Sequence, residues 1–414
     1  MVNHMKKEML KKYARLIAAT GGNIQKGQEV RIYASVEQPE FTRMVAEECY
    51  RLGAKKVMVE FNYQPLDKLN IKRRSLATLS KLEDWEIARM DHRLKTLPVM
   101  IYLDSDDPDG MKGINQSKNS KASQARYKIL KPYLDKMENR YQWVIAAVPG
   151  AAWAKKVFPG LPKKRAIEKL WESILYTSRV NEGEDPVAAW DAHNRDLAAR
   201  CEYLNGLNLE TLEYKASNGT DLRVGLLEGT VFMGGAERTL GGNVVFNPNI
   251  PTEEAFTSPR KGAADGVVYA SKPLSYRGEM IENFRIRFAD GKAVEVHAEK
   301  NEELLREMIS MDEGAAYLGE CALVPFDSPI CRSNLLFYNT LFDENAACHL
   351  ALGHGITNVL KDYADLTTEE CYKRGINDSM IHVDFMIGTA DLSITGITRD
   401  GRRVPIFTDG NWAF

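Results

Sequence analysis

Cysteine is scarce in this sequence, and a secretion signal and long hydrophobic runs are missing. The six cysteines include no C-x-x-C pair, which argues against a disulfide framework and predicts reduced thiols in a cytoplasmic protein. The first 13 residues are charged and contain no apolar signal-peptide core. The longest strongly apolar stretch, residues 143–154, covers 12 residues around a Pro-Gly pair and is too short to cross a bilayer. The sequence therefore predicts a cytoplasmic protein with no membrane partner.

An excess of charge of either sign is missing as well. The chain has 55 Lys and Arg against 57 Asp and Glu, a net charge of −2, so neither nucleic acid nor an anionic membrane is an expected partner. With 44% hydrophobic and 27% charged residues, the composition is that of a folded globular protein. Its 414 residues, at roughly 150 residues per domain, predict two or three domains.

Several well-known catalytic and nucleotide-binding motifs are also absent. The sequence has no G-x-x-x-x-G-K-[ST] loop, and no G-x-G-x-x-G follows its first predicted strand, so a nucleotide site is not indicated, although phosphate-binding loops can lack both. It has no G-x-S-x-G elbow, no H-E-x-x-H helix and no zinc-type cysteine cluster. The glycine pairs at 234–235 and 241–242 are interpreted as turns.

The first half alternates helical and strand patterns. Apolar residues recur at helical spacing over residues 6–20, and the helix is expected to end at the Gly-Gly pair that follows. Strands separated by helical stretches predict βαβ crossovers and a mainly parallel sheet. We therefore expect a doubly wound α/β domain over residues 1–200. The predicted strands cover residues 28–36, 54–61, 98–104 and 141–149, with a helix over 38–52.

The second half has a different texture. Residues 160–200 are predicted helical and lead into three hairpins, which turn at Asn218-Gly219, Asp290-Gly291 and Asp400-Gly401. Each Asx-Gly pair lies between alternating apolar runs, the pattern that a type I′ turn requires. We expect a C-terminal α+β domain with antiparallel strands over residues 201–414, with the boundary near residues 195–205.

One short motif combines an imidazole and a carboxylate. His382-Val383-Asp384 lies in the apolar segment MIHVDFMIG, and residues i and i+2 of a strand point to the same face. Burying this pair without a partner is costly. Two interpretations stay open: the pair satisfies itself by a hydrogen bond, or both residues are metal ligands.

Three further polar sites lie upstream. His349 occupies an apolar segment, Glu320 precedes another, and Glu253-Glu254 follows a turn-like Ile-Pro pair. Each has a purely structural explanation: a core or capping histidine, a solvated glutamate, and a helix N-terminus capped by Thr252. Residue spacing alone cannot join these sites, because they are scattered along the chain.

Taken together, longer motifs carry a resemblance to a known family. They are NPNIPTEEAFTSP, YLGECALVP, LLFYNTLFDENAACHLALG, GINDSMIHVDFMIG and the terminal VPIFTDGNW. In order and spacing they resemble the aminopeptidase T, PepS and aminopeptidase II family of metallo-aminopeptidases. The segment LKKYARLIAATGGNIQKGQEVRI resembles the N-terminal domain of the same family, so the resemblance extends over nearly the whole chain.

The resemblance implies a dinuclear metal site in the second domain. Glu320 would bridge the two ions, and Glu254 is preferred to Glu253 as a ligand because of its spacing to Glu320. The resemblance also implies a homodimer assembled around an internal cavity. The implied ligands are Glu254, Glu320, His349, His382 and Asp384.

The chain departs from the family pattern just after the histidine at 349. Relatives have a tyrosine thought to assist the transition state where this chain has Ile356. Tyr338, Tyr363 or His354 is a candidate to replace it. Glu253, if it is not a ligand, is the candidate general base or the anchor for the ammonium group of the substrate.

The implied ligand set makes chemical sense for a hydrolase. Three carboxylates and two neutral imidazoles carry a formal charge of −3, and like charges 4 Å apart repel by ~4 kcal/mol at an effective dielectric of 20. Two divalent ions change −3 to +1, and mixed N/O ligands suit zinc, cobalt or manganese. Such ions lower the pKa of bound water toward ~7 and polarise a carbonyl. The predicted function is a metal-dependent aminopeptidase that hydrolyses the N-terminal residue of peptide substrates through water activated by two metal ions.

Two other functions are consistent with the residues. A dinuclear phosphoesterase would place basic groups around the metals, and Arg260-Lys261 and Arg332 are the candidates. A non-catalytic α/β ligand-binding protein would use the His-Asp pairs only as structural hydrogen bonds.

Overall fold

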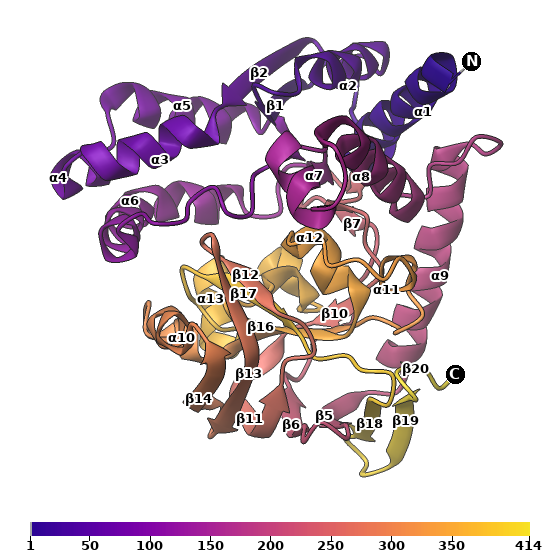
Figure 1. The fold of residues 1–414 in the computed structure, drawn as a ribbon. Coiled ribbons are helices and arrows are strands. Elements are labelled where there is room, and N and C mark those ends of the chain that lie inside the picture. Colours follow the sequence, from indigo (N-terminus) through magenta and orange to yellow (C-terminus); the bar gives the residue numbers. More distant parts are fainter. Residues whose placement is uncertain (1) are drawn as a thin grey trace. The chain divides into compact units, whose positions relative to one another are not determined.

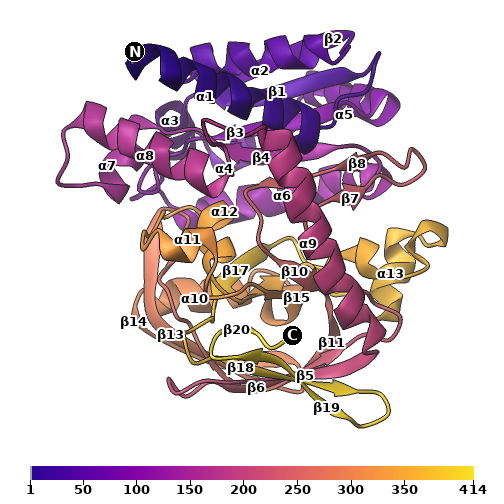
Figure 2. The same cartoon turned by 90° about the vertical axis from the view of Figure 1, so that its right-hand side faces the viewer.

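The computed structural model describes residues 2–414, and its chain forms two compact units (Figures 1 and 2). The first unit contains residues 2–194 and Ala236–Pro251, and the second contains Arg195–Gly235 and Thr252–Phe414. The chain thus enters the second unit close to the predicted boundary, but a short segment then returns to the first. Whether the units are separate folding domains, as predicted for residues 1–200 and 201–414, stays a prediction.

The first unit is built on a parallel five-stranded sheet with the order β2-β1-β3-β4-β9. The central strands are almost entirely buried, whereas β2 at the edge is largely exposed. Burial on both faces explains why the central strands have nearly continuous apolar sequences. The α/β class predicted from the sequence is confirmed. The strands are β1 (Glu29–Ser35), β2 (Lys56–Asn62), β3 (Val99–Asp104), β4 (Trp143–Ala147) and β9 (Asn249–Ile250).

Helices connect successive strands of this sheet. The predicted helix over residues 6–20 is α1, which continues as a π-helical segment, η1 (Ile17–Gly21). Helices α4 and α5 pack against α6, and α7 packs against α8. A two-stranded ribbon, β7 (Glu237–Arg238) with β8 (Val245–Phe246), belongs to the returning segment. The helices are α1 (Val2–Leu16), α2 (Pro39–Arg51), α3 (Gln64–Arg73), α4 (Leu76–Ser80), α5 (Asp84–Thr96), α6 (Gln116–Met137), α7 (Ala151–Val157), α8 (Lys163–Thr177) and α9 (Pro186–Gly206).

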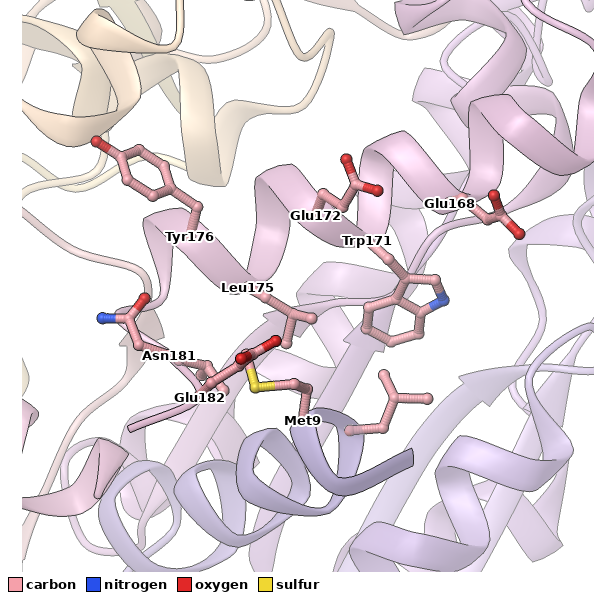
Figure 3. Close-up of a pocket in the computed structure, with 10 residues that line it drawn as sticks. Met9, Glu168, Trp171, Glu172, Leu175, Tyr176, Asn181 and Glu182 are labelled. Atoms are coloured by element: carbon pink, nitrogen blue, oxygen red, sulfur yellow. The ribbon is translucent and has the colours of Figure 1, made fainter. Parts of the chain in front are cut away.

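An apolar cavity of about 370 Å³ lies between α1 and α8 (Figure 3). Met9 of α1 faces Trp171 and Leu175 of α8 across it. The nearby 181–184 loop is fastened to α1, because the Lys12 ammonium donates to the carbonyls of Asn181 and Glu182 at 2.9 and 2.6 Å. The walls are mainly hydrocarbon and do not form a cluster of convergent metal ligands.

The second unit contains a nine-stranded antiparallel sheet. Its strand β6 alternates buried Leu222 and Val224 with exposed Asp221 and Arg223, the pattern of a sheet with one face on the core. The path is β12-β13-β11-β6-β5-β18-β19-β20, and β14 pairs with β13. The strands are β5 (Leu209–Lys215), β6 (Asp221–Leu226), β11 (Pro259–Tyr269), β12 (Leu274–Tyr276), β13 (Glu279–Ala289), β14 (Lys292–Lys300), β18 (Ser393–Thr398), β19 (Arg403–Thr408) and β20 (Asn411–Trp412).

All three predicted hairpins form, but only one uses the predicted turn. At Asp290-Gly291 both residues have positive φ, +50° and +78°, and two residues join β13 to β14. Asn218 and Asp400 are not among the residues with positive φ, and their hairpin loops are longer. The type I′ expectation is therefore wrong at these two positions, because the longer loops need only the glycine in the left-handed region.

A second, four-stranded antiparallel sheet has the order β10-β15-β16-β17. It lies within the largest hydrophobic core of this unit, together with strands of the nine-stranded sheet. Its strands are β10 (Ala255–Thr257), β15 (Leu318–Leu323), β16 (His349–Gly353) and β17 (His382–Met386). The short helices of the unit are α10 (Glu302–Ile309), α11 (Pro329–Arg332), α12 (Thr340–Asp343) and α13 (Thr368–Arg374), with 3-10 turns η2 (Gly314–Ala316), η3 (Glu344–Ala346), η4 (Thr357–Val359) and η5 (Tyr363–Asp365).

Among residues 2–414, no helix combines the length and the apolar character needed to cross a bilayer. All six cysteines are free thiols, and five of them are buried.

Candidate metal centre

The four-stranded sheet carries all five residues predicted as metal ligands. Glu254 directly precedes β10, Glu320 lies within β15, His349 begins β16, and His382 and Asp384 lie on β17. The purely structural explanations for two of them are wrong: residues 252–254 form no helix, and Glu320 is buried inside a strand rather than solvated.

Strand register explains how these distant residues meet. Ala351 of β16 pairs with Glu320 on one side and with Asp384 on the other, so the two carboxylates flank a methyl group on one row of the sheet. Residues i and i+2 share a face, which places His349 and His382 on the same face as this row. A bulge between Leu318 and Glu320 adjusts β15 at this point.

The side chains converge in two groups that share one member. Glu254, Glu320 and His349 form the first group, and Glu320 joins His382 and Asp384 in the second; within each group the ligand atoms lie within 4.8 Å of one another. His349 Nε2 lies 3.1 Å from Glu254 Oε2, and His382 Nε2 lies 3.0 Å from Glu320 Oε2. Ligand atoms bound at 2.0–2.2 Å in a tetrahedral site are separated by about 3.3–3.6 Å, so only small adjustments are needed to admit an ion.

Main-chain carbonyls orient both imidazoles. His382 Nδ1 lies 2.8 Å from the carbonyl oxygen of His354, and His349 Nδ1 lies 3.2 Å from that of Ala347. A carbonyl oxygen can only accept, so Nδ1 carries the proton in each ring and Nε2 faces the carboxylates. This is the arrangement in which metal-ligating histidines are held in other proteins.

The carboxylates have strongly perturbed electrostatics. Burial, together with the charges of Glu254 and Asp384, raises the pKa of Glu320. Burial also opposes ionisation of Asp384, but the charge and hydrogen bond of His382 outweigh it and lower the pKa of Asp384. Glu254, Glu320 and Asp384 are only 5–7% exposed, so water cannot screen these charges effectively.

The pKa values of both imidazoles are raised by the neighbouring carboxylates. Burial alone would lower the pKa of His349, but its hydrogen bond to Glu254 and the nearby Asp384 and Glu320 raise it to about 10. The pKa of His382 also lies well above its ordinary value, because Asp384 and Glu320 outweigh desolvation. The carboxylates therefore favour positive charge at this position, which either a proton on the imidazole or a bound cation can supply.

The residues present fit a divalent cation. The buried oxygen Asp384 Oδ1 lies 3.3 Å from His382 Nε2, a separation close to that of two ligand atoms on one tetrahedral ion. Carboxylate oxygens and imidazole Nε2 atoms are ligands for zinc, cobalt and manganese. His382 is the exposed member of the set, so solvent reaches the centre on its side.

Glu344 is a functional candidate that the sequence interpretation missed. It follows α12 and interacts with Asp384, and burial plus the charges of Asp384 and Glu254 raises its pKa well above the ordinary value. Asn345 beside it accepts a hydrogen bond from the Glu253 amide at 2.7 Å. Asp343, Glu344 and Asn345 form a polar cluster in the sequence, but no periodic pattern indicates which of these side chains faces the sheet.

The three predicted catalytic residues lie in different settings. Glu253 is buried next to Glu254, and its main chain is held by Asn345. His354 follows β16; its carbonyl orients His382, and its ring makes an edge contact with Tyr372. Tyr338 precedes α12, with a φ of +55°.

Lys261 and Arg332, two of the candidate phosphate-binding residues, contact other side chains, and the main chain of Ile356 is hydrogen-bonded to Ser258. Lys261 lies over the ring of Tyr317, with Nζ 5.0 Å from its centre, and Arg332 pairs with Asp327 at 3.2 Å. Arg260 is exposed. The main chain of Ile356 is fixed by Ser258, whose Oγ accepts from the Ile356 amide at 2.7 Å and donates to its carbonyl at 3.1 Å.

Comparison with known proteins extends this picture. The family of thermophilic metalloproteases, M29, matches residues 6–412. Aminopeptidase AmpS of Bacillus subtilis is 41% identical over 408 residues, covering 98% of this chain and 99% of that protein. Aminopeptidase 2 of Geobacillus stearothermophilus is 42% identical over 414 residues, covering 100% and 99%. The structure of wild-type AmpT from Thermus thermophilus superposes with a TM-score of 0.88 at 40% identity, covering 99% of this chain and all of that one.

Proposed function

This chain belongs to the M29 family of thermophilic metalloproteases and is a metal-dependent aminopeptidase; from that premise we propose that its centre holds two divalent cations. The observation that carries the proposal is that two groups of potential ligands share Glu320. Glu320 would bridge the ions. The remaining ligands would be Glu254, His349, His382 and Asp384.

When bound, such ions activate a water molecule and polarise the carbonyl of the scissile peptide bond. The residues of the chain supply position and charge. Main-chain carbonyls fix the tautomer of both imidazoles, so that Nε2 is the available donor atom. The buried carboxylates lie on or next to strands that the sheet holds in place. They therefore need little rearrangement during the reaction, and little free energy is lost to it.

We assign the proton-transfer and substrate-anchoring roles to carboxylates beside the ligands. Glu253 is proposed as the general base or as the anchor for the α-ammonium of the substrate, which would restrict cleavage to the N-terminal residue. Glu344 is a second candidate for moving a proton, because it interacts directly with Asp384. His354 and Tyr338 are proposed as donors toward the substrate. A free ammonium at the cleavage end distinguishes this substrate class from that of an endopeptidase.

The alternatives have less support. The basic residues expected of a phosphoesterase, Lys261 and Arg332, contact Tyr317 and Asp327. A purely structural role for the His-Asp pair explains the 3.3 Å contact between His382 Nε2 and Asp384 Oδ1, but it does not explain why Glu254, Glu320 and His349 converge beside it.

Three finer assignments complete the proposal. The mixed nitrogen and oxygen donor set, with no thiolate, favours zinc, cobalt or manganese. The family resemblance supports a homodimer. Six free cysteines support a reducing compartment, the cytoplasm.

Removal of metal should abolish activity and lower thermal stability. Treatment with EDTA is expected to stop hydrolysis of leucyl-p-nitroanilide, and zinc, cobalt or manganese should restore it. Binding of an ion at 100 times its dissociation constant stabilises the native state by about 2.7 kcal/mol, so the melting temperature should rise by roughly 3 °C. N-acetyl-leucyl-p-nitroanilide is the control and should not be cleaved. Equal cleavage of both substrates, or activity that survives complete metal removal, would contradict the proposal.

Ile356→Tyr should increase turnover. A phenol in this position would donate a hydrogen bond to the developing oxyanion, an interaction that is worth 10²–10³ in rate where it is well placed. Because Ile356 packs against an apolar cluster, the larger ring costs about 1–3 kcal/mol in stability. We expect kcat to rise about tenfold with KM within roughly twofold. Ile356→Phe is the matched control, with the ring but no hydroxyl; a similar gain in both variants would rule out the hydrogen bond.

A further inference from the structure

A second cavity, of about 300 Å³, lies in the first unit at the carboxyl ends of its parallel strands. Residues at or after the ends of four strands line it: Ser35 at the end of β1 and Glu37 after it, Lys68 after β2, Ser105 and Asp106 after β3, and Gly150 after β4. The cavity therefore belongs to the sheet itself and not to a single loop.

Its position is the one where open α/β sheets bind ligands. The chain leaves β1 toward β2 on one side, and leaves β3 toward β4 on the other, so the strand order reverses between β1 and β3. The helices after two such strands cover opposite faces of the sheet, which opens a crevice outside their carboxyl ends. The residues that follow β1 and β3 form part of the cavity wall.

The lining is rich in carboxylates but includes one ammonium. Glu37, Asp106, Asp107 and Asp109 contribute acids, and Lys68 is the basic residue. The Asp106 carboxyl has a hydrogen-bond partner in Asn62 but no cationic partner, and Lys68 forms no ion pair with the described residues. Although Asp106 is exposed at the rim, desolvation by the walls and the charge of Asp104 raise its pKa to about 6, so a bound cation would relieve this unfavourable charge.

A buried hydroxyl in the cavity wall lacks a partner. Ser105 is 8% exposed, lines the cavity, and its Oγ has no hydrogen bond within the described residues. Unpaired buried hydroxyls are uncommon, because each loses its bonds to water without replacement. This observation is independent of the acidic residues and indicates a polar occupant.

Other wall residues are already fixed, so the cavity is largely preformed. The Gln64 amide bonds twice to the main chain of Asp107, with both distances 3.1 Å. Lys156 pairs with Asp109 at 2.8 Å, and Glu37 accepts from the Ala151 amide at 3.3 Å. Asp106, Lys68 and Ser105 are therefore the groups left for a ligand.

We propose that this cavity binds a free α-amino acid, with its ammonium group at Asp106 and its carboxylate at Lys68. The volume is at the lower end of the range for small-molecule sites, ~300–1,000 Å³, and suits a single amino acid rather than a peptide. The site is additional to the metal centre. Its connection with the peptidase is that the ligand is of the same chemical class as the released product.

The wall chemistry separates this ligand from two others. A phosphorylated ligand would meet several carboxylates and a single lysine, which is unfavourable. A bare divalent cation needs several ligand oxygens close together, and within the described residues no three acids of this cavity meet the distance criterion that the metal centre meets.

Binding should be measured by calorimetry on the full-length Glu320→Gln variant in EDTA, so that catalysis and the metal centre contribute nothing. Three ligands separate the two charges. L-leucine has both the ammonium and the carboxylate, leucinamide has only the ammonium, and N-acetyl-L-leucine has only the carboxylate. We expect L-leucine to bind most tightly and N-acetyl-L-leucine not to bind. Adding Asp106→Asn to this variant should weaken its affinity for L-leucine by at least about tenfold. Adding Asp191→Asn instead, at an exposed carboxylate of α9, should leave the affinity unchanged.

Lys68→Ala provides the second test. It should reduce the affinity for L-leucine to that for leucinamide and leave leucinamide unchanged. The single variant Asp106→Asn, in the otherwise unaltered enzyme with its metal, should keep its melting temperature and its turnover of leucyl-p-nitroanilide. Unchanged L-leucine binding in the Asp106→Asn background would overturn the proposal. Once the EDTA has been removed by dialysis, heat released by magnesium chloride alone and abolished by Asp106→Asn would also overturn it, in favour of a cation site.

Discussion

Glu320→Gln is expected to lose at least about 10³-fold in kcat/KM for leucyl-p-nitroanilide and to lose its bound metal. Glu320 belongs to both ligand groups, so the amide removes a charge and a bridging oxygen from both sites at once. The fold should persist, because the pKa of Glu320 is raised by burial and a neutral side chain of the same shape removes that desolvation cost. Kinetics, elemental analysis and the melting temperature in EDTA measure the three effects.

The control is Glu307→Gln, at an exposed glutamate of α10 in the same unit, which should behave as the unaltered enzyme. His382→Ala should reproduce the loss of activity and metal through a different ligand. Full turnover in either ligand variant would contradict the proposed centre. A melting temperature in EDTA that falls far below that of the metal-free parent would show that Glu320 is needed for folding instead.

Gly353→Ala is expected to destabilise the protein by about 3 kcal/mol or more and to reduce activity strongly. Gly353 has φ +102°, and a Cβ atom there would lie 2.1 Å from the carbonyl oxygen of Ile381. The left-handed conformation costs a non-glycine residue ~1 kcal/mol, and overlap with a fixed main-chain atom adds ~1–3 kcal/mol. Because Gly353 pairs with His382 across β16 and β17, the strain acts on a proposed ligand. Denaturant unfolding and kcat/KM are the measurements.

Gly401→Ala separates the two contributions. Gly401 has φ +84°, but nothing lies within 4 Å of a Cβ built there, so this variant should show the conformational cost alone, about 1 kcal/mol. If both variants unfold at the same denaturant concentration, close approach of the strands is not what constrains Gly353.

Local pattern was sufficient to predict much of the fold. Strands β1 to β4 follow from apolar runs, helices α1 and α2 follow from helical spacing that stops near glycine, and β17 follows from MIHVDFMIG. The return of residues 236–251 to the first unit was not predictable in this way, since β7, β8 and β9 each contain only two residues. Strands this short have no measurable periodicity, and their pairing is decided by tertiary contacts.

The candidate centre illustrates the same limit. Only His382 and Asp384 are close in sequence, and their shared face could be deduced from strand geometry. Glu320 and His349 depend on the strand register around Ala351, and Glu254 depends on the pairing of β10 with β15, so all three were identified through the resemblance. Glu344 was missed because it lies in a 3-10 turn, η3, where no regular period relates one side chain to the next. The assignment of all these residues as ligands or proton carriers stays a prediction, whereas the aminopeptidase family is confirmed.

Position 354 combines two tasks that mutation can separate. The carbonyl that aligns His382 belongs to the main chain, and every amino acid provides the same atom. The side chain at 354 can therefore change while the atom that aligns the imidazole of His382 stays the same.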